Sequence, residues 1–240
     1  MSTHFISDLH LDASHPETIQ HFFAYLHTHA KEADALYILG DLFEVWMGDD
    51  AETPITKAIA AELRDLADSG VPIFYLHGNR DFLLGSTFAK QSGFELLPDP
   101  WVFDLYGIRT LLLHGDTLCT EDKRYLQVRA RYRRPFFKHL FLSLPLFIRK
   151  SIATRLRKAS LNHVSTLSMN LMDSTQSEIE GLMRTFKAQV MIHGHTHRPT
   201  IQHFQLDDKL VSRIVLSDWN DKSGNVLIIN KDGTQRLIYI

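Results

Sequence analysis

Short apolar runs that alternate with amphipathic segments most limit the folds open to this chain. Three runs, at residues 5–8, 36–41 and 73–79, have the length of buried strands, and each ends in polar residues. Between them, residues 17–29 and 54–68 repeat apolar positions at helical spacing. Strands and helices that alternate in this order predict a layered α/β fold.

The same apolar pattern returns later in the chain and predicts further strands. No helix is expected after Pro199, and residues 230–233 have the composition of a hairpin turn. The later expected strands cover residues 102–105, 110–114, 190–193, 212–218, 225–230 and 235–240.

The segment from about residue 122 to residue 172 interrupts this alternation. It is predicted to be helical, with Pro135 and Pro145 as breakers, and we interpret it as an insertion or cap within one domain that covers residues 1–240. Residues 121–158 contain 12 basic and 2 acidic residues, a net charge of +10, whereas the rest of the chain carries −12. Such a segment indicates an anionic partner, although a solvated helical face would give the same count.

Composition excludes several classes of protein. Hydrophobic residues make up 44% of the chain and charged residues 22%, which is typical of a globular domain rather than a disordered chain or a fibre. No apolar run reaches the roughly 18–20 residues that a membrane-spanning helix needs. The first residues show no signal-peptide pattern and the single Cys119 suits a reducing compartment, so we expect a cytoplasmic protein.

Polar clusters lie where the expected strands end. Because α/β sheets bind ligands at the carboxyl ends of their strands, five such ends would gather Asp, Asn and His in one cavity. These donors suit divalent ions such as Mn, Fe or Zn, and the neighbouring glycines permit close approach of the backbone. Each cluster alone is weak evidence, since a D-x-H triplet arises by chance and a Gly-Asp pair is commonly a turn. The clusters are Asp8-Leu9-His10, Gly40-Asp41, Gly78-Asn79-Arg80-Asp81, His114-Gly115-Asp116 and Gly194-His195-Thr196-His197.

Taken in this order, the clusters resemble the motifs of the calcineurin-like metallophosphoesterases, D-x-H, G-D, G-N-[HR]-[DE], H and G-H-x-H. The resemblance covers the chain outside the insertion, and it implies a β-sandwich flanked by helices with a helical insertion cap. It also implies two metal ions, usually Mn²⁺, with Asp41 as the bridging catalytic carboxylate. By motif, Asp8, His10, Asp41 and His197 would hold one ion, and Asp41, Asn79, His114 and His195 the other.

Longer strings narrow the resemblance to a branch of this family that acts in lipid A biosynthesis on UDP-2,3-diacylglucosamine. One of them is His77-Gly78-Asn79-Arg80-Asp81-Phe82-Leu83-Leu84-Gly85. The resemblance implies hydrolysis of the pyrophosphate, by attack of a metal-bound hydroxide on the α phosphorus, to UMP and 2,3-diacylglucosamine 1-phosphate. Arg80, where many relatives have histidine, is expected to bind the phosphate oxygens and to stabilise charge that develops on them. Asn79 and His195 would also contact this substrate.

The insertion is compatible with a substrate that carries two acyl chains. It mixes large apolar residues with basic ones, as interfacial helices do, although an amphipathic helix packed on the domain would have the same pattern. We expect Phe137 and Phe141 to line an acyl site. Basic residues such as Arg149 and Lys150 are expected to bind an anionic membrane surface.

By resemblance, the insertion also binds the head group of the substrate. Asp122 and Ser160 match the family pattern by position, and Tyr125 lies on the same expected helical face as Asp122. The pattern departs at Val164 and Leu167, where relatives have a polar residue and a lysine. A cationic contact is therefore missing or comes from a basic neighbour.

Three functions remain open from sequence. The first is a dinuclear hydrolase of a nucleotide-linked lipid, peripheral on the cytoplasmic face of the inner membrane, monomeric and without a nucleic-acid partner. The second keeps the metals but acts on a soluble nucleotide, which would not need an apolar insertion. The third is a non-catalytic membrane adaptor, against which the complete set of motif ligands counts. We interpret Asp49-Asp50 as a solvated loop, and His77 and His193 as structural residues.

Overall fold

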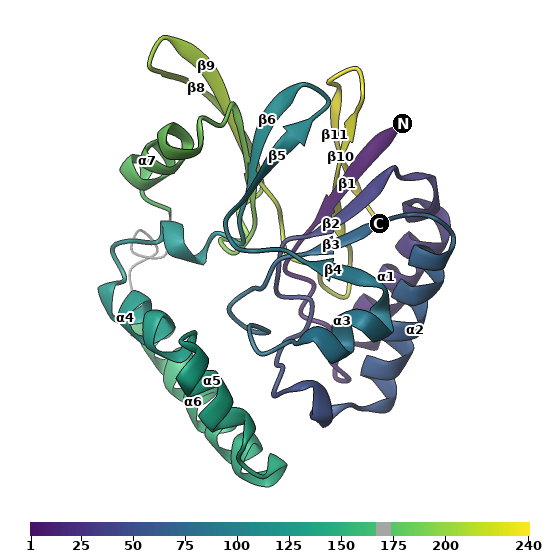
Figure 1. The fold of residues 1–240 in the computed structure, drawn as a ribbon, viewed down its shortest axis with the longest axis vertical. Helices are drawn as coiled ribbons and strands as arrows, with labels where there is room; N and C mark the ends of the chain where they lie inside the picture. The colour runs from purple at the N-terminus through teal and green to yellow at the C-terminus, as the bar shows by residue number, and fades with distance from the viewer. Residues whose placement is uncertain (167–173) are drawn as a thin grey trace.

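Two β-sheets form the centre of the molecule (Figure 1). The computed structural model describes residues 1–166 and 174–240, and for residues 158–166 the backbone alone. The first sheet has six strands in the order β11-β10-β1-β2-β3-β4, of which β1 to β4 run parallel. Its strands are β1 (Ser2–Ile6), β2 (Ala35–Ile38), β3 (Ile73–Tyr75), β4 (Phe94–Leu96), β10 (Asn225–Asn230) and β11 (Gln235–Tyr239).

The second sheet has five strands in the order β5-β6-β7-β9-β8, and β6, β7 and β9 run parallel. Hydrogen bonds join the loops beyond the strand ends: Asp8 N–H donates to Gly40 O, and Gly194 N–H donates to His114 O. The His195 N–H donates to Asp8 Oδ2 and so links the two sheets. The strands are β5 (Trp101–Leu105), β6 (Ile108–Leu112), β7 (Val190–His193), β8 (Thr200–Leu206) and β9 (Lys209–Val215).

Apolar side chains from both sheets fill the space between them. Phe5, Leu39 and Ile192 belong to this cluster and are fully buried. The Tyr37 ring lies 5.2 Å from the Phe5 ring and 5.1 Å from the Phe103 ring. Complete burial of side chains of this size contributes about 1.5–3 kcal/mol each, so this layer holds the two sheets face to face.

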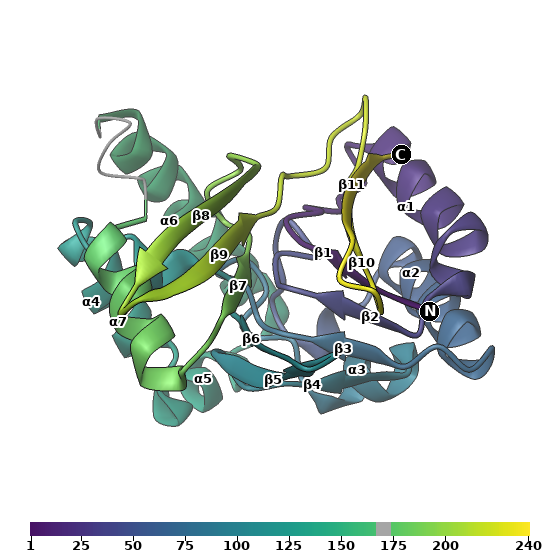
Figure 2. The same ribbon diagram turned by 90° about the horizontal axis from the view of Figure 1, so that it is seen from above.

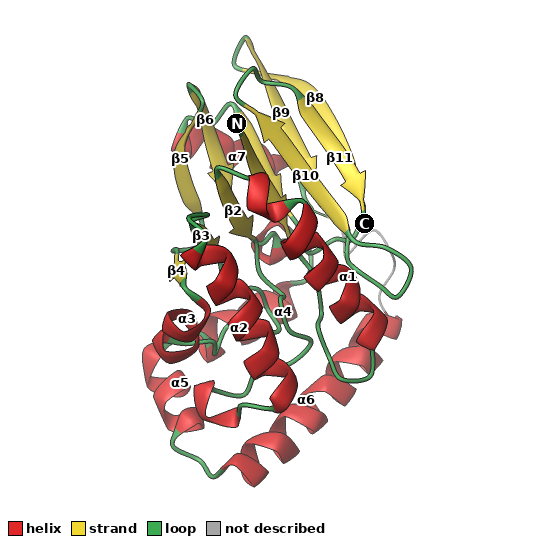
Figure 3. Ribbon diagram, turned by 90° about the vertical axis from the view of Figure 1, so that its right-hand side faces the viewer, coloured by secondary structure: helices red, strands yellow, loops and turns green. Residues whose placement is uncertain are grey.

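Helices cover the outer faces of both sheets (Figures 2 and 3). Fully buried Phe22 of α1 and Leu63 of α2 belong to the core cluster of the first sheet, and Ile179 and Met183 of α7 pack on the second. The predicted layered α/β fold with a helix-flanked sandwich is therefore confirmed. The helices are α1 (Pro16–Thr28), α2 (Pro54–Asp68), α3 (Ser86–Ser92) and α7 (Gln176–Phe186), with short 3₁₀ turns at Ala30–Glu32, Asp49–Ala51 and Asp116–Leu118.

Three helices between β6 and β7 form the helical insertion (residues 123–166), which extends away from the sheets (Figure 1). They are α4 (Lys123–Tyr132), α5 (Pro135–Leu142) and α6 (Leu146–Thr166). Proline begins α5 and precedes α6, as expected of a residue that breaks one helix and is tolerated in the first turn of the next. No helix in the described part of the chain has both the length and the apolar character needed to cross a bilayer.

Candidate metal centre

Five of the seven predicted ligand residues have a left-handed backbone, which is uncommon for residues other than glycine. Their φ angles lie between 49° and 68°, and they follow the ends of β1, β2 and β7. This conformation costs of order 1–3 kcal/mol per residue, and such strain gathers at functional sites. The five residues are Asp8, His10, Asp41, His195 and His197.

Two of the motif glycines are required because their backbone lies so close to the side chain of a predicted ligand. A Cβ atom on Gly78 would lie 2.0 Å from Asp41 Oδ1, and one on Gly194 would lie 2.1 Å from Asp8 Oδ2. Both distances are well below van der Waals contact, and each neighbour is a hydrogen-bonded carboxylate. A larger residue at either glycine would therefore displace a predicted ligand.

Asp8 lies at the centre of the first group of predicted ligands, which also contains His10 and His197. Its Oδ2 accepts hydrogen bonds from the Ser7 hydroxyl (2.6 Å) and the His195 N–H (2.9 Å). Its Oδ1 is buried without a hydrogen-bond partner among the described residues, 3.3 Å from His197 Nε2 and 3.9 Å from His10 Nε2. The protein thus holds one carboxylate oxygen, while the other oxygen faces two imidazole rings that are 3.4 Å apart at their Nε2 atoms.

Asp41 lies between the two groups of ligands. The Arg80 N–H donates to Asp41 Oδ1 (2.8 Å), whereas Asp41 Oδ2 lies 3.7 Å from His114 Nε2 and 3.9 Å from His10 Nε2. An oxygen that faces both groups is the arrangement expected of a bridging carboxylate. The groups whose ligand atoms all lie within 4.8 Å of one another are Asp8, His10 and His197, and Asp8, Asp41 and His114.

His114 connects the remaining predicted ligands. Its Nδ1 lies 2.8 Å from Leu39 O and carries the proton in this contact, because a carbonyl oxygen only accepts. Its Nε2 lies 2.8 Å from Asn79 Oδ1, which also accepts, so without a metal ion the ring has a proton on this nitrogen too, and a bound cation would replace that proton. The His195 ring packs edge-on against the His114 ring, with 5.1 Å between their centroids. All seven predicted ligand residues therefore lie in one cluster.

The electrostatics of this cluster favour a cation. Burial raises the pKa of the Asp41 carboxyl to about 6 against the effect of His114, and burial lowers the pKa of His195 to about 4. Burial also acts to lower the pKa of His114, but the charges of Asp41 and Asp8 outweigh it and raise this pKa to about 9. Buried carboxylates that shift an imidazole in this way produce a negative potential at the centre.

A divalent cation fits the donor set. Buried polar atoms normally have partners, yet Asp8 Oδ1 has none among the described residues, and two imidazole nitrogens face each other beside it. Carboxylate oxygens, imidazole nitrogens and an amide oxygen are ligands that Mn, Fe and Zn accept. A cation between these atoms would supply the missing partner.

Two acidic residues that support the centre were not predicted from sequence. Asp81 is fully buried, and it accepts hydrogen bonds from Leu42 N–H (2.7 Å) and Gly78 N–H (3.0 Å), so it joins two ligand-bearing loops. Glu44 lies beside His10 and Arg80. The only hints are the last position of the G-N-R-D motif for Asp81 and proximity to Asp41 in sequence for Glu44.

Asp116 fastens α4 to the metal centre. Its Oδ2 accepts hydrogen bonds from the Tyr125 hydroxyl (2.6 Å) and Arg129 Nε (2.5 Å), and Arg129 Nη2 also lies 3.2 Å from Asp99 Oδ2. The Tyr125 ring stacks on the His195 ring at a centroid distance of 6.4 Å. Tyr125 is therefore beside the cluster, as expected, but its hydroxyl is already bonded to Asp116.

The other predicted substrate contacts are distributed over the insertion. Asp122 caps the N-terminus of α4, where its Oδ1 accepts from Tyr125 N–H (2.9 Å). Arg80 is 31% exposed, so part of its guanidinium is open to a ligand. The side chain of Ser160 and the whole of Leu167 lie outside the described residues.

Phe137 and Phe141 are half-buried rather than open to solvent. The Arg131 guanidinium lies 5.0 Å from the centre of the Phe137 ring, and Phe141 packs against the core cluster of the first sheet. Other large apolar side chains of the insertion are more than one-third exposed, namely Val128, Tyr132, Phe136, Leu140, Phe147 and Leu156.

Arg149 is not a surface charge, and the expectation that it binds a membrane is wrong. The residue is 1% exposed. Its guanidinium donates to Leu144 O (2.9 Å) and Met47 O (2.5 Å), and it pairs with both carboxylate oxygens of Asp50. These bonds fasten the start of α6 to the body. Lys150 is exposed, as expected.

The interpretation of Asp49 as part of a solvated loop is also wrong. Its carboxylate accepts hydrogen bonds from Trp46 Nε1 (3.1 Å) and from three backbone N–H groups at the start of α3, those of Gly85, Thr87 and Phe88. An acceptor at this position satisfies N–H groups that a helix cannot pair internally. Asp49 is therefore a structural cap.

His77 and His193 are structural, as expected. His77 Nε2 lies 2.7 Å from Leu84 O, and His193 is fully buried beside Arg213, whose Nε donates to His193 Nε2 at 2.9 Å. Burial lowers the pKa of His193 to about 3, so this ring stays neutral.

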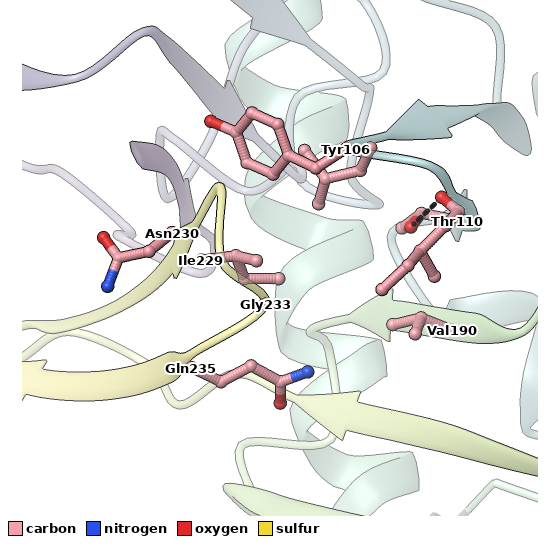
Figure 4. A pocket seen from close by; sticks show the side chains of 9 residues that line it. Tyr106, Thr110, Val190, Ile229, Asn230, Gly233 and Gln235 are labelled. Carbon is pink, nitrogen blue, oxygen red and sulfur yellow. Dashed lines mark hydrogen bonds between the residues drawn. The ribbon is translucent and has the colours of Figure 1, made fainter. Parts of the chain in front are cut away.

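A small hollow lies between the sheets, at the opposite ends of the parallel strands from the ligands (Figure 4). Ile108 and Thr110 near the start of β6, and Val190 at the start of β7, line it together with Tyr106 and Ile229. The hollow contains no carboxylate or imidazole in its lining, so it offers no counterpart to the chemistry of the metal centre.

Comparison with known proteins agrees with the arrangement of these residues. A family model described as calcineurin-like phosphoesterase matches residues 1–199. Proteins named UDP-2,3-diacylglucosamine hydrolase, from Salmonella paratyphi B and Salmonella choleraesuis, are 44% identical to this chain over 239 residues, which is 100% of this chain and 99% of each relative. The solved structure of an archaeal phosphodiesterase shares the fold with a TM-score of 0.50 at 14% identity, covering 100% of both chains. Since the family model extends over most of the sequence, the chain belongs to the calcineurin-like phosphoesterase family.

Proposed function

We propose that this protein hydrolyses the pyrophosphate bond of UDP-2,3-diacylglucosamine and releases UMP and 2,3-diacylglucosamine 1-phosphate. The observation that carries the proposal is the full-length identity of 44% to proteins named for this substrate. The gathering of all seven ligand residues supports a metal-dependent reaction. A non-catalytic adaptor would not require five left-handed residues around one cluster.

The metal centre would hold two Mn²⁺ ions. Bound divalent ions would supply Lewis acidity, which neutralises phosphate oxygens and activates water. We assign Asp41 to both ions because its Oδ2 faces both groups of ligands. One ion would also bind Asp8, His10 and His197, and the other Asn79, His114 and His195.

The side chains of the protein position the substrate and its charge. Arg80 lies at the edge of the cluster with its backbone N–H bonded to Asp41, so its guanidinium can pair with the phosphate oxygens that gain charge during attack. Burial keeps His195 neutral, so its lone pair is available at physiological pH. Asn79 and His195 would contact the phosphate from the opposite sheets. Attack at the α phosphorus would place ¹⁸O from labelled water in UMP.

The segment predicted as a cap, from about residue 122 to residue 172, would bind the lipid. Phe137 and Phe141 are half-buried, which suits the wall of an acyl site, and Asp122, Tyr125 and Ser160 would contact the head group. The exposed apolar side chains on the insertion, with exposed basic residues between them, support peripheral attachment to the cytoplasmic face of an anionic inner membrane. We propose that the monomer is sufficient, because the seven candidate ligands gather within one chain.

The release of UMP tests this function. Rates are measured with the diacylated substrate and with an unlipidated UDP-sugar, each with Mn²⁺ and with a chelator. We expect Mn²⁺-dependent release that is faster with the lipid. Equal rates on both substrates would favour the soluble-nucleotide function, and release in metal-free protein would contradict the metal mechanism.

A further inference from the structure

Glu44 occupies a position that the metal mechanism does not use. It lies in the loop after Asp41, and its side chain is 16% exposed. The backbone N–H of Glu44 is directed to Leu11 O (3.4 Å), in the loop that carries Asp8 and His10. Two ligand-bearing loops therefore meet at this residue.

The Glu44 carboxylate contacts three positive or protonatable groups from three separate parts of the chain. Oε2 lies 3.0 Å from His10 Nδ1. This is a charge contact at ion-pair distance, because His10 Nδ1 has no hydrogen-bond partner among the described residues. Oε1 lies 2.7 Å from Arg157 Nη2 in α6 and 3.7 Å from Arg80 Nη1. A single side chain thus joins a predicted metal ligand, the predicted phosphate-binding arginine and the helical insertion.

The contact with His10 has a consequence for metal binding. A carboxylate beside Nδ1 favours the tautomer with its proton on Nδ1, which leaves the lone pair on Nε2. His10 Nε2 is the atom that faces Asp8 Oδ1 and His197 Nε2. The charge of the carboxylate therefore favours the tautomer that leaves Nε2 available to a metal ion.

The contacts with the two arginines hold Glu44 and Arg80 in place. The guanidinium of Arg157 offsets the negative charge of Glu44, which limits the cost of placing that carboxylate beside Asp8 and Asp41. At 3.7 Å the pairing with Arg80 is loose, and Arg80 remains 31% exposed, so it can still reach a phosphate.

We propose that Glu44 is a positioning residue, which orients His10 for the metal and Arg80 for the phosphate while Arg157 anchors it to the insertion. This inference rests on the metal-dependent function proposed above. The alternative is that Glu44 only contributes an ion pair to folding stability.

The test measures Mn²⁺ affinity by competition with a fluorescent chelator, for wild type, Glu44→Gln and Glu44→Ala. Loss of a carboxylate behind a metal-binding histidine typically costs about 10–100-fold in affinity or activity, and we expect a loss of that size in both variants. We also expect kcat on bis(4-nitrophenyl) phosphate to fall, because Arg80 loses its tether. The matched control is Glu180→Gln, which removes a carboxylate paired with Arg184 on α7.

The melting temperature of the metal-free proteins separates positioning from stability. We expect metal-free Glu44→Gln to melt within about 2 °C of wild type while the increase in melting temperature on adding Mn²⁺ becomes smaller. Arg157→Gln should weaken Mn²⁺ binding less than Glu44→Gln does, because Glu44 loses one anchor but its carboxylate remains beside His10. Wild-type Mn²⁺ affinity in Glu44→Gln would overturn the inference, whether or not stability falls. Failure of wild type to bind Mn²⁺ would instead refute the proposed function.

Discussion

Replacing Arg149 with methionine is expected to destabilise the fold, although the residue lies in a basic segment that resembles a solvated surface. Methionine keeps much of the aliphatic volume but cannot donate to Leu144 O or Met47 O. A buried group left without its partner costs about 1–3 kcal/mol. Leu144 and Met47 are half-buried, so we place each carbonyl at the lower end, and the two together cost about 2 kcal/mol or more. Asp50 is 62% exposed and regains water, so loss of its ion pair adds little.

Urea unfolding followed by tryptophan fluorescence, in the presence of a chelator, measures this loss. The matched control is Lys150→Met, at the exposed neighbouring position, which should remain within about 0.5 kcal/mol of wild type. At the lower limit of 2 kcal/mol, the melting temperature should fall by at least about 4 °C for a chain of this size. If Arg149→Met were as stable as Lys150→Met, the buried hydrogen bonds of Arg149 would not stabilise the fold.

Three further predictions concern the centre, a cap and a buried histidine. Asp41→Ala should lower kcat by at least about 10²-fold, and added Mn²⁺ should not restore it, which a Mn²⁺ titration of UMP release would show. Asp49→Ala should lower the free energy of unfolding by about 1–2 kcal/mol through loss of the α3 cap, with Mn²⁺ affinity unchanged; a loss of Mn²⁺ affinity would contradict its structural role. Burial lowers the pKa of His4 to about 4 in the folded protein, whereas the ordinary histidine pKa is about 6.5. As the pH drops below about 6.5, His4 is protonated in the unfolded chain before it is protonated in the folded one, so the free energy of unfolding falls. Between pH 7 and pH 5, the free energy of unfolding of metal-free His4→Gln should therefore fall by about 2 kcal/mol less than that of wild type. Urea titrations at the two pH values measure this difference, and an equal fall in both proteins would refute the prediction.

Local patterns predicted the longer elements of the fold. The bounds of α2 agree to the residue, because Thr53 and Thr56 form a capping box and the apolar spacing continues to Leu66. By contrast, α3 and β4 have seven and three residues and were not predicted. Elements of this length contain too few repeats for periodicity to indicate them, and they are stabilised by burial of Phe88 and Phe94 in the core.

Two later elements were also missed. α7 has apolar residues at the spacing of a helix face, Ile179, Leu182, Met183 and Phe186, so the sequence contains the signal and the prediction omitted it. β8 is largely exposed and lies at the edge of its sheet, so it lacks the apolar run of a buried strand. Its register is set by pairing with β9, a contact between strands that no local pattern contains.

The candidate site was predicted better than the residues around it. The motifs predicted seven candidate ligands that the structure brings together in one cluster, because parallel strands place their ends at one edge. The supporting residues depend on partners that are distant in sequence. Arg149 bonds to Asp50, 99 residues away, and Glu44 bonds to Arg157 of α6. Neither pairing follows from the composition of either segment. Arg149 was instead predicted to bind a membrane, and no role was predicted for Glu44.

The charge asymmetry of the chain also has a different explanation in the structure. A segment of charge +10 on an acidic body predicted an anionic partner, yet four of its arginines pair with the body itself. These are Arg129 with Asp116 and Asp99, Arg133 with Asp99, Arg149 with Asp50, and Arg157 with Glu44.

The four paired arginines therefore attach the insertion to the acidic body. Only the other exposed basic residues remain available to bind a membrane or a phosphate. Apart from the four paired arginines, the exposed basic residues of the segment among those described are Lys123, Arg124, Arg131, Arg134, Lys150 and Arg155. Near an anionic surface each contributes about 1 kcal/mol, and the contribution weakens with salt. Attachment to vesicles should consequently depend on this set and not on the four paired arginines, whose loss would instead loosen the insertion from the body.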